Sequence, residues 1–185
     1  QYLSGKFNAS VDYASDMNEF LEPVLESSVA EGDFGMTESM LEDHPAQVGL
    51  SRFLNEEELK RLKLDEWQAD YTLKEGILEL KNMNLRSGNL EMALEGKQDL
   101  IEDELDYKAT LWVPQKYAGN LSKVISSRGV KALTQDDGRV KIPMSITGSS
   151  ENVKYRPDKE IINDLIKELL KDNVKDKIGN IFGNG

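Results

Sequence analysis

The sequence contains no cysteine and a single histidine, His44. Disulfide bonds and thiolate metal sites are therefore excluded, as is a zinc site built from several histidines. His44 lies in EDHPAQ, a stretch with turn-like composition before a helix, and we interpret it as a turn residue. The spacing shows no serine–histidine–aspartate pattern, although such triads assemble in space rather than along the chain. We expect no catalytic group, no metal and no cofactor.

The sequence also lacks a long apolar run and an excess of basic residues. No segment has the length of a transmembrane helix, and the first residues do not resemble a signal peptide. Gln1 leads directly into the alternating stretch YLSGKFNASVDY, so we expect a part of a larger protein, with any membrane anchor or export signal upstream. The formal net charge of −11 disfavours nucleic-acid binding through a basic surface.

Alternation of apolar and polar residues dominates what is present, above all in DYTLKEGILELKNMNLRSGNLEMALEGKQDL, residues 70–100. A period of two predicts strands with one apolar face, and the glycines of Glu75-Gly76 and Ser87-Gly88 predict turns between them. The same alternation is found in residues 7–13, 105–113 and 140–146. Residues 27–41 are expected to form a further strand or hairpin, loosened by Gly32 and Gly35.

Three other segments indicate helices. Residues 46–64 are predicted to form a helix, with Asn55 and Glu58 as a capping box. Residues 116–133 are expected to be helical or irregular. Asp158 is predicted to cap a long final helix, whose apolar residues recur at helical spacing at 161, 162, 165, 166, 169, 170, 174 and 178.

The fold class predicted from these patterns is α+β, mainly β. It consists of a curved antiparallel meander with one apolar face, covered in part by two or three helices. Residues 1–157 are expected to form the sheet with its inserted helices, and residues 158–185 the C-terminal amphipathic helix and tail.

Two acidic segments contain the residue types of a catalytic or a metal-binding site. The carboxylates of IEDELDY, residues 101–107, have the composition of a glycosidase pair, but a solvated loop between strands is favoured there. TQDDGRV, residues 134–140, resembles part of a calcium loop that lacks the closing glutamate, so a hairpin turn is favoured. In the final helix, lysines beside the apolar stripe (Lys167, Lys171, Lys175 and Lys177) fit a membrane interface, whereas packing on the sheet is the favoured alternative.

Taken in order, three features resemble the C-terminal region of the AsmA-like family of Gram-negative envelope proteins. The first is YTLKEGILELKNMNLRSGNLEMALEGKQDLIEDELDYKATLWVP, with its Glu75-Gly76 and Ser87-Gly88 turns. The second is VKIPMSITGSSENVKYRPD, residues 140–158, in which Asn152 replaces the proline usual in the family. The third is the lysine-rich helix with a glycine-rich tail, ELLKDNVKDKIGNIFGNG.

The resemblance implies a non-enzymatic periplasmic protein, anchored in the inner membrane by an upstream helix and related to TamB-like bridge-like lipid-transfer proteins. It implies an apolar groove for phospholipid, and thereby a role in phospholipid transport or outer-membrane homeostasis. The groove candidates are Leu90, Met92, Leu94, Leu105, Tyr107, Leu111, Val140, Ile142, Met144 and Ile146. The alternative is a structural module that recruits another envelope protein through its sheet edge or its C-terminal helix.

Overall fold

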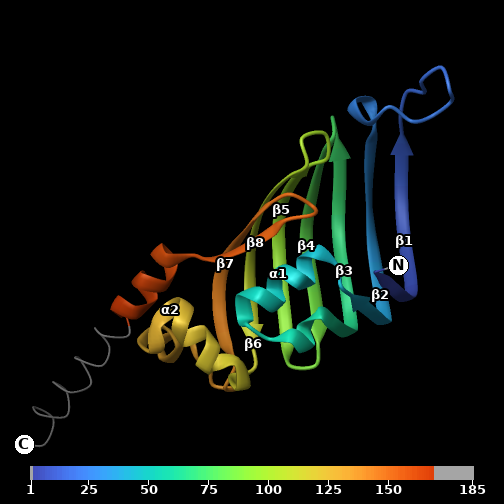
Figure 1. Cartoon of the computed structure of the whole chain (residues 1–185). Coiled ribbons are helices and arrows are strands. Elements are labelled where there is room, and N and C mark those ends of the chain that lie inside the picture. Colours follow the sequence, from blue (N-terminus) through green and yellow to red (C-terminus); the bar gives the residue numbers. More distant parts are fainter. Residues whose placement is uncertain (1, 169–185) are drawn as a thin grey trace, which may run out of the picture.

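The structure, a computed structural model, describes residues 2–168. These residues form one antiparallel sheet of eight strands that follow one another in sequence order (Figure 1). The strands are β1 (Leu3–Ala14), β2 (Val29–Glu42), β3 (Arg61–Lys74), β4 (Ile77–Ser87), β5 (Leu90–Asp99), β6 (Glu104–Val113), β7 (Val140–Gly148) and β8 (Val153–Pro157). The predicted meander and the mainly β class of fold are confirmed.

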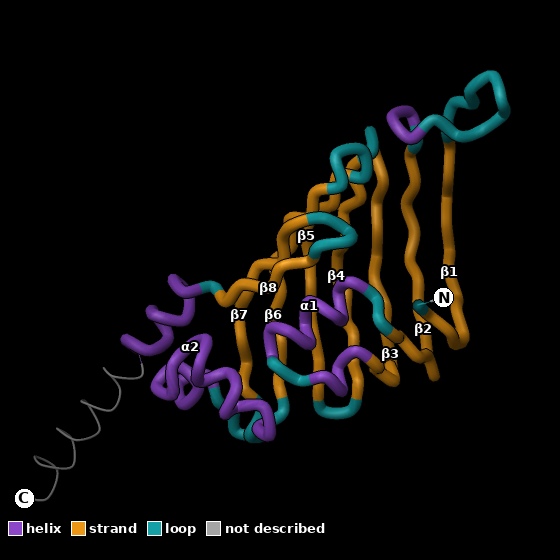
Figure 2. The backbone as a smooth tube through the Cα atoms, viewed as in Figure 1, coloured by secondary structure: helices purple, strands orange, loops and turns teal. Residues whose placement is uncertain are grey.

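The helices lie in the connections between strands and after the last strand (Figure 2). They are η1 (Leu25–Ser27), α1 (Pro45–Leu54), η2 (Glu57–Lys60), η3 (Gln115–Tyr117), α2 (Ala118–Leu133) and a helix that begins at residue 159 and is described to residue 168. Helix α1 crosses in front of the sheet, and α2 covers the end near β7 (Figure 1). Both therefore pack on the same, concave face.

The strand register brings apolar residues into continuous rows across this face. One row runs through Phe7, Met36, Trp67, Leu85, Met92, Leu111 and Ile142, one residue from each strand from β1 to β7. Because side chains alternate between faces along a strand, the polar residues between these positions lie on the convex face. The period-two pattern of the sequence thus becomes a sheet with one apolar side.

The prediction of a single helix over residues 46–64 is wrong. Helix α1 begins after His44, whose Nδ1 accepts a hydrogen bond from the backbone N–H of Ala46. It ends at Asn55, which adopts the left-handed conformation with φ of 53°. The Asn55–Glu58 pair therefore ends a helix instead of starting one, and His44 is a helix cap instead of a plain turn residue. Residues from Arg61 on belong to β3, where Leu62 and Leu64 are buried on the concave face.

Three smaller expectations were resolved by the structure. Residues 29–42 form one strand, so Gly32 and Gly35 do not divide it into a hairpin. The α2 segment is broken at Ser126, where the backbone leaves the helical region. Asp158 caps the final helix as predicted, since its Oδ1 accepts from the backbone N–H groups of residues 160 and 161. The apolar positions 169, 170, 174 and 178 and three of the four lysines lie outside the described residues.

Candidate functional site

All ten groove residues predicted from the sequence lie on the concave face, in the hydrophobic core or packed against it. Nine of them are buried, and Leu105 is partly buried. Leu111, Val140 and Ile142 are fully covered. These side chains are therefore packed against protein in this structure, and the section of the face that they form is closed.

The helices close this section by placing their own apolar residues in the hollow of the sheet. Leu50 and Leu54 of α1 and Leu121 of α2 are buried there. Helix α1 reaches across the hollow to β8, where an added Cβ on Gly49 would lie 2.8 Å from the Val153 carbonyl oxygen. A glycine at this position lets the helix backbone approach the strand closely. The C-terminal half of the concave face is consequently the folding core.

The N-terminal part of the same face is open. On β1, Phe7, Val11 and Tyr13 are 61%, 56% and 50% exposed, although they continue the apolar rows of the core. An open groove of about 700 Å³ lies over β1, β2 and β3. Its lining residues are Leu3, Ser4, Gly5, Phe7, Ala9, Phe34, Met36, Trp67 and Tyr71. We refer to this feature as the β1–β3 groove.

Three aromatic rings form the floor of the β1–β3 groove, one from each strand. Phe7 stacks on Phe34 with ring centroids 6.4 Å apart, and Phe34 meets Trp67 edge to face at 5.3 Å. Such pairs hold large apolar surfaces in defined positions. The ladder offers a ligand a broad surface without a charged group, which suits a flexible hydrocarbon chain better than a polar molecule.

Two buried polar atoms in this region have no hydrogen-bond partner among the described residues. They are Oγ of Ser39 and Nε1 of Trp67, on β2 and β3. Unpaired buried donors and acceptors cost folding free energy and are rare in native proteins. Both atoms lie beside the β1–β3 groove, so the buried polar groups are less completely hydrogen-bonded there than in the core under α1.

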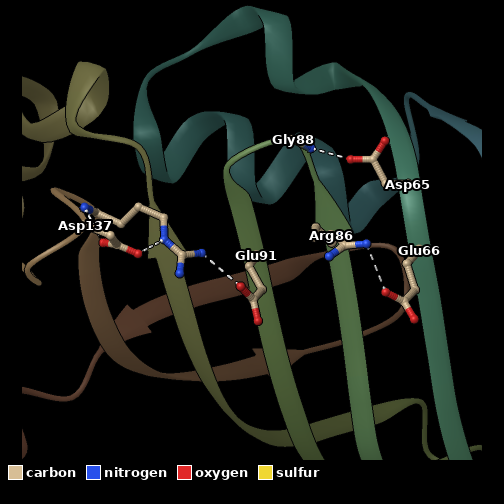
Figure 3. A network of polar contacts seen from close by, with 7 residues as sticks. Asp65, Glu66, Arg86, Gly88, Glu91 and Asp137 are labelled. Carbon is tan, nitrogen blue, oxygen red and sulfur yellow. Dashed lines mark hydrogen bonds and ion pairs between the residues drawn. The ribbon is translucent and has the colours of Figure 1, made fainter.

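The convex face carries the charged residues, and cross-strand contacts tie its strands together (Figure 3). Asp65 accepts a hydrogen bond from the backbone N–H of Gly88 at 2.7 Å, and Arg86 pairs with Glu66 at 3.3 Å. Arg139 bridges two acids, Glu91 at 2.9 Å and Asp137 at 2.7 Å. Hydrogen bonds from Arg139 lower the pKa of Asp137. These contacts tie β3 to β4 and tie β5 to the turn before β7.

Two tyrosines of the closed section, Tyr107 and Tyr155, stay neutral. Burial raises the pKa of Tyr107 to about 12, and burial raises the pKa of Tyr155 as well. Both side chains therefore remain protonated over the physiological pH range. Their hydroxyl groups therefore add no charge to the core under the helices.

The acidic candidates of the sequence have structural roles. Asp103 accepts hydrogen bonds at 3.0 Å from both the backbone N–H and the hydroxyl group of Ser150, which joins the β5–β6 and β7–β8 connections. The segment 134–140 forms a hairpin turn closed by the Gln135 N–H to Arg139 carbonyl bond. Within residues 2–168, no group of three or more histidine, aspartate or glutamate side chains is placed to hold a metal ion.

Comparisons with protein-family models, with curated proteins and with solved structures found no match to this chain. In the part of the chain that the structure describes, no helix is long and apolar enough to cross a membrane.

The ten residues that the resemblance proposes for the groove lie in the section of the concave face that the helices cover. Several residues that line the β1–β3 groove, among them Phe7, Ala9 and Tyr71, lie in predicted strands, and none of the lining residues was proposed as a ligand contact. An available signal was the concentration of aromatic residues at the concave positions of the first strands, Phe7, Tyr13, Phe34, Trp67 and Tyr71.

Proposed function

We propose that this protein is a non-enzymatic domain that binds the acyl chains of phospholipids in its β1–β3 groove. In this proposal it acts in the periplasm as part of an AsmA-like protein, and contributes to phospholipid transport or outer-membrane homeostasis. The observation that carries the proposal is that the apolar rows of the core continue onto β1 and remain exposed there.

The physical chemistry of the β1–β3 groove supports this ligand class. Burying apolar surface contributes about 25 cal/mol per Å² without directional demands, so a chain can slide without being trapped at one position. The groove is open to solvent, so a polar headgroup can stay in water while the tails contact the aromatic ladder. A specific polar ligand would need converging donors and acceptors, which its lining does not offer.

A matched pair of variants on β1 tests this function. Phe7→Asp places a charge in the β1–β3 groove, and Asn8→Asp places the same charge on the convex side of the same strand. Both residues are exposed, so Asn8→Asp should lower the free energy of unfolding by less than about 0.5 kcal/mol, and Phe7→Asp, which also loses the stack on Phe34, by about 1 kcal/mol. We expect a fluorescent phospholipid analogue to bind the unaltered chain and Asn8→Asp, and to bind Phe7→Asp roughly tenfold less tightly. Equal binding by the two variants would refute the assignment.

A second candidate function, recruitment of an envelope protein through the sheet edge, has support of its own. Strand β1 pairs only with β2 among the described residues, and it is 12 residues long. A long edge strand with exposed apolar residues is a template for pairing with another strand. If this function holds, amides of β1 will become protected from hydrogen exchange when partner is added, while lipid binding stays unchanged.

The C-terminal helix is the other route for recruitment. Ile162 is buried in the core, so a deletion from residue 158 would uncover the core and is a poor test. Removal of residues 169–185 leaves Ile162 in place. Loss of partner binding with intact lipid binding in this variant would support recruitment through residues 169–185, and loss of neither would exclude recruitment through those residues.

A further inference from the structure

The β1–β2 connection presents the most exposed large apolar side chains of the described residues. It projects beyond the strand ends, at the end of the sheet opposite α1 and α2 (Figure 1). Phe20 is 74% exposed and Leu21 is 81% exposed, with Met17 beside them at 58%. We call residues 17–23 the β1–β2 tip.

Hydrogen bonds within the β1–β2 tip hold it in a defined turn. The carboxamide oxygen of Asn18 accepts hydrogen bonds from the backbone N–H groups of Phe20 at 2.9 Å and of Glu22 at 3.0 Å. The backbone N–H of Asn18 donates to the Glu22 carbonyl oxygen at 3.0 Å, and a bridge between Met17 and Pro23 closes the base. These bonds fix the turn, so Phe20 and Leu21 are held in water by the fold itself.

Leu21 has an unusual backbone conformation. Its φ is +60°, in the left-handed region that residues with a Cβ rarely adopt. A glycine or asparagine would occupy this position with less strain. A strained leucine with almost its whole side chain in water gains nothing for the folded monomer, and such outliers gather at functional positions.

The charge around the β1–β2 tip has one sign. The four connections at this end of the sheet, residues 15–28, 75–76, 100–103 and 149–152, contain no lysine and no arginine. Their acidic residues are Asp16, Glu19, Glu22, Glu26, Glu75, Glu102, Asp103 and Glu151. Lys74, at the end of β3, pairs with Glu75 of the next connection at 3.9 Å. At the opposite end, α2 carries Lys123, Arg128 and Lys131 and no acidic residue.

We propose that the β1–β2 tip is a docking point for a basic amphipathic segment of another protein. Apolar side chains of that segment would pack on Phe20, Leu21 and Met17, and its lysines or arginines would face the carboxylates around them. Aromatic and long apolar side chains that are held in place are the usual anchors of such contacts, and complementary charge raises the rate of encounter. An anionic phospholipid surface is the disfavoured partner, since acidic residues surround the apolar pair.

This surface is separate from the β1–β3 groove, and the proposal stands on different residues. The probe is a labelled synthetic helical peptide with leucines on one face and lysines on the other. Its matched control is the same peptide with glutamates in place of the lysines. Vesicles containing phosphatidylglycerol are the third arm. The protein variants are Phe20→Ser with Leu21→Ser at the tip, and Val124→Ser on α2 as an exposed apolar control.

We expect the lysine peptide to bind the full chain, with affinity that falls as salt rises, and the glutamate peptide not to bind. The tip variant should bind the lysine peptide at least roughly tenfold more weakly, with Val124→Ser unchanged. Amide chemical shifts should change within residues 15–28. Unchanged binding by the tip variant, or shift changes confined to the β1–β3 groove, would overturn the proposal. Vesicle binding that depends on Phe20 and Leu21 would also overturn it, in favour of a membrane.

Discussion

Phe34 and Trp67 meet edge to face, with ring centroids 5.3 Å apart, on adjacent strands of the concave face. This pair marks the boundary between two sections of one apolar surface. Beyond Trp67, the rows continue into the core under α1, where Leu111 and Ile142 are fully buried. Before Phe34, the rows end on β1, where Phe7 remains exposed. The same sequence pattern therefore makes both a core and an open groove.

The closed section should be sensitive to the loss of side-chain volume, and the open section should not. Leu111→Ala removes buried methyl groups from a fully covered site and should lower the free energy of unfolding by about 2–5 kcal/mol. Val11→Ala, on the exposed part of the same face, should change it by less than about 0.5 kcal/mol. Urea unfolding followed by tryptophan fluorescence measures both values. A cost at Val11 equal to that at Leu111 would mean that β1 is covered in solution.

Gly96 should be irreplaceable because of its close approach to β6. Its φ is +140°, and an added Cβ would lie 2.3 Å from the Asp106 carbonyl oxygen and 2.8 Å from Cα of Tyr107. Gly96→Ala should therefore destabilise the chain by about 1–3 kcal/mol through backbone strain and displacement. Gly35 in β2 has nothing within 4 Å of its would-be Cβ and is the matched control. Gly35→Ala should be neutral or slightly stabilising; a larger loss there than at Gly96 would contradict the register.

The His44 cap should make stability depend on pH. Burial lowers the pKa of His44 below its usual value of 6.5, so the unfolded chain binds a proton more readily than the folded chain. Its contribution is therefore complete above about pH 6.5 and is lost as the pH falls through the lower folded value. Protonation at Nδ1 would also end the hydrogen bond from Ala46 at 3.2 Å.

Asparagine is a good helix cap that does not titrate, so His44→Asn is the control. The free energy of unfolding is measured for the original chain and for His44→Asn at pH 7.5 and at pH 5.5. Between these two values, the original chain should lose more stability than His44→Asn. A difference that is constant across this range would exclude the titrating cap.

The strands could be predicted because the pattern that specifies them lies within a few neighbouring residues of the chain. Alternation in residues such as Leu90, Met92 and Leu94 gives the face, and Gly76 and Gly88 give the turns. The end of α1 was missed because Asn55 and Glu58 have the composition of a helix start. The deciding factor was the pairing of residues from Arg61 on with β2, a contact between segments far apart in the chain.

The open part of the face could not be predicted for the same reason. Which apolar residues are covered depends on where α1 packs, and Gly49 of α1 contacts Val153 and Tyr155, about a hundred residues later in the sequence. Local periodicity treats Phe7 and Leu111 alike. Only the tertiary structure separates them into a ligand-facing candidate and a core residue.

The two tryptophans allow the most direct test of acyl-chain binding. Trp67 lies beside the β1–β3 groove, whereas Trp112 lies on the convex face with the Lys141 ammonium 5.6 Å from its ring. Trp112→Phe and Trp67→Phe each leave one reporter, and each can be titrated with a phospholipid whose acyl chains carry bromine, a contact quencher of indole fluorescence. We expect bromolipid to quench Trp67 and to leave Trp112 unaffected. Equal quenching of the two, or quenching of neither, would contradict this expectation.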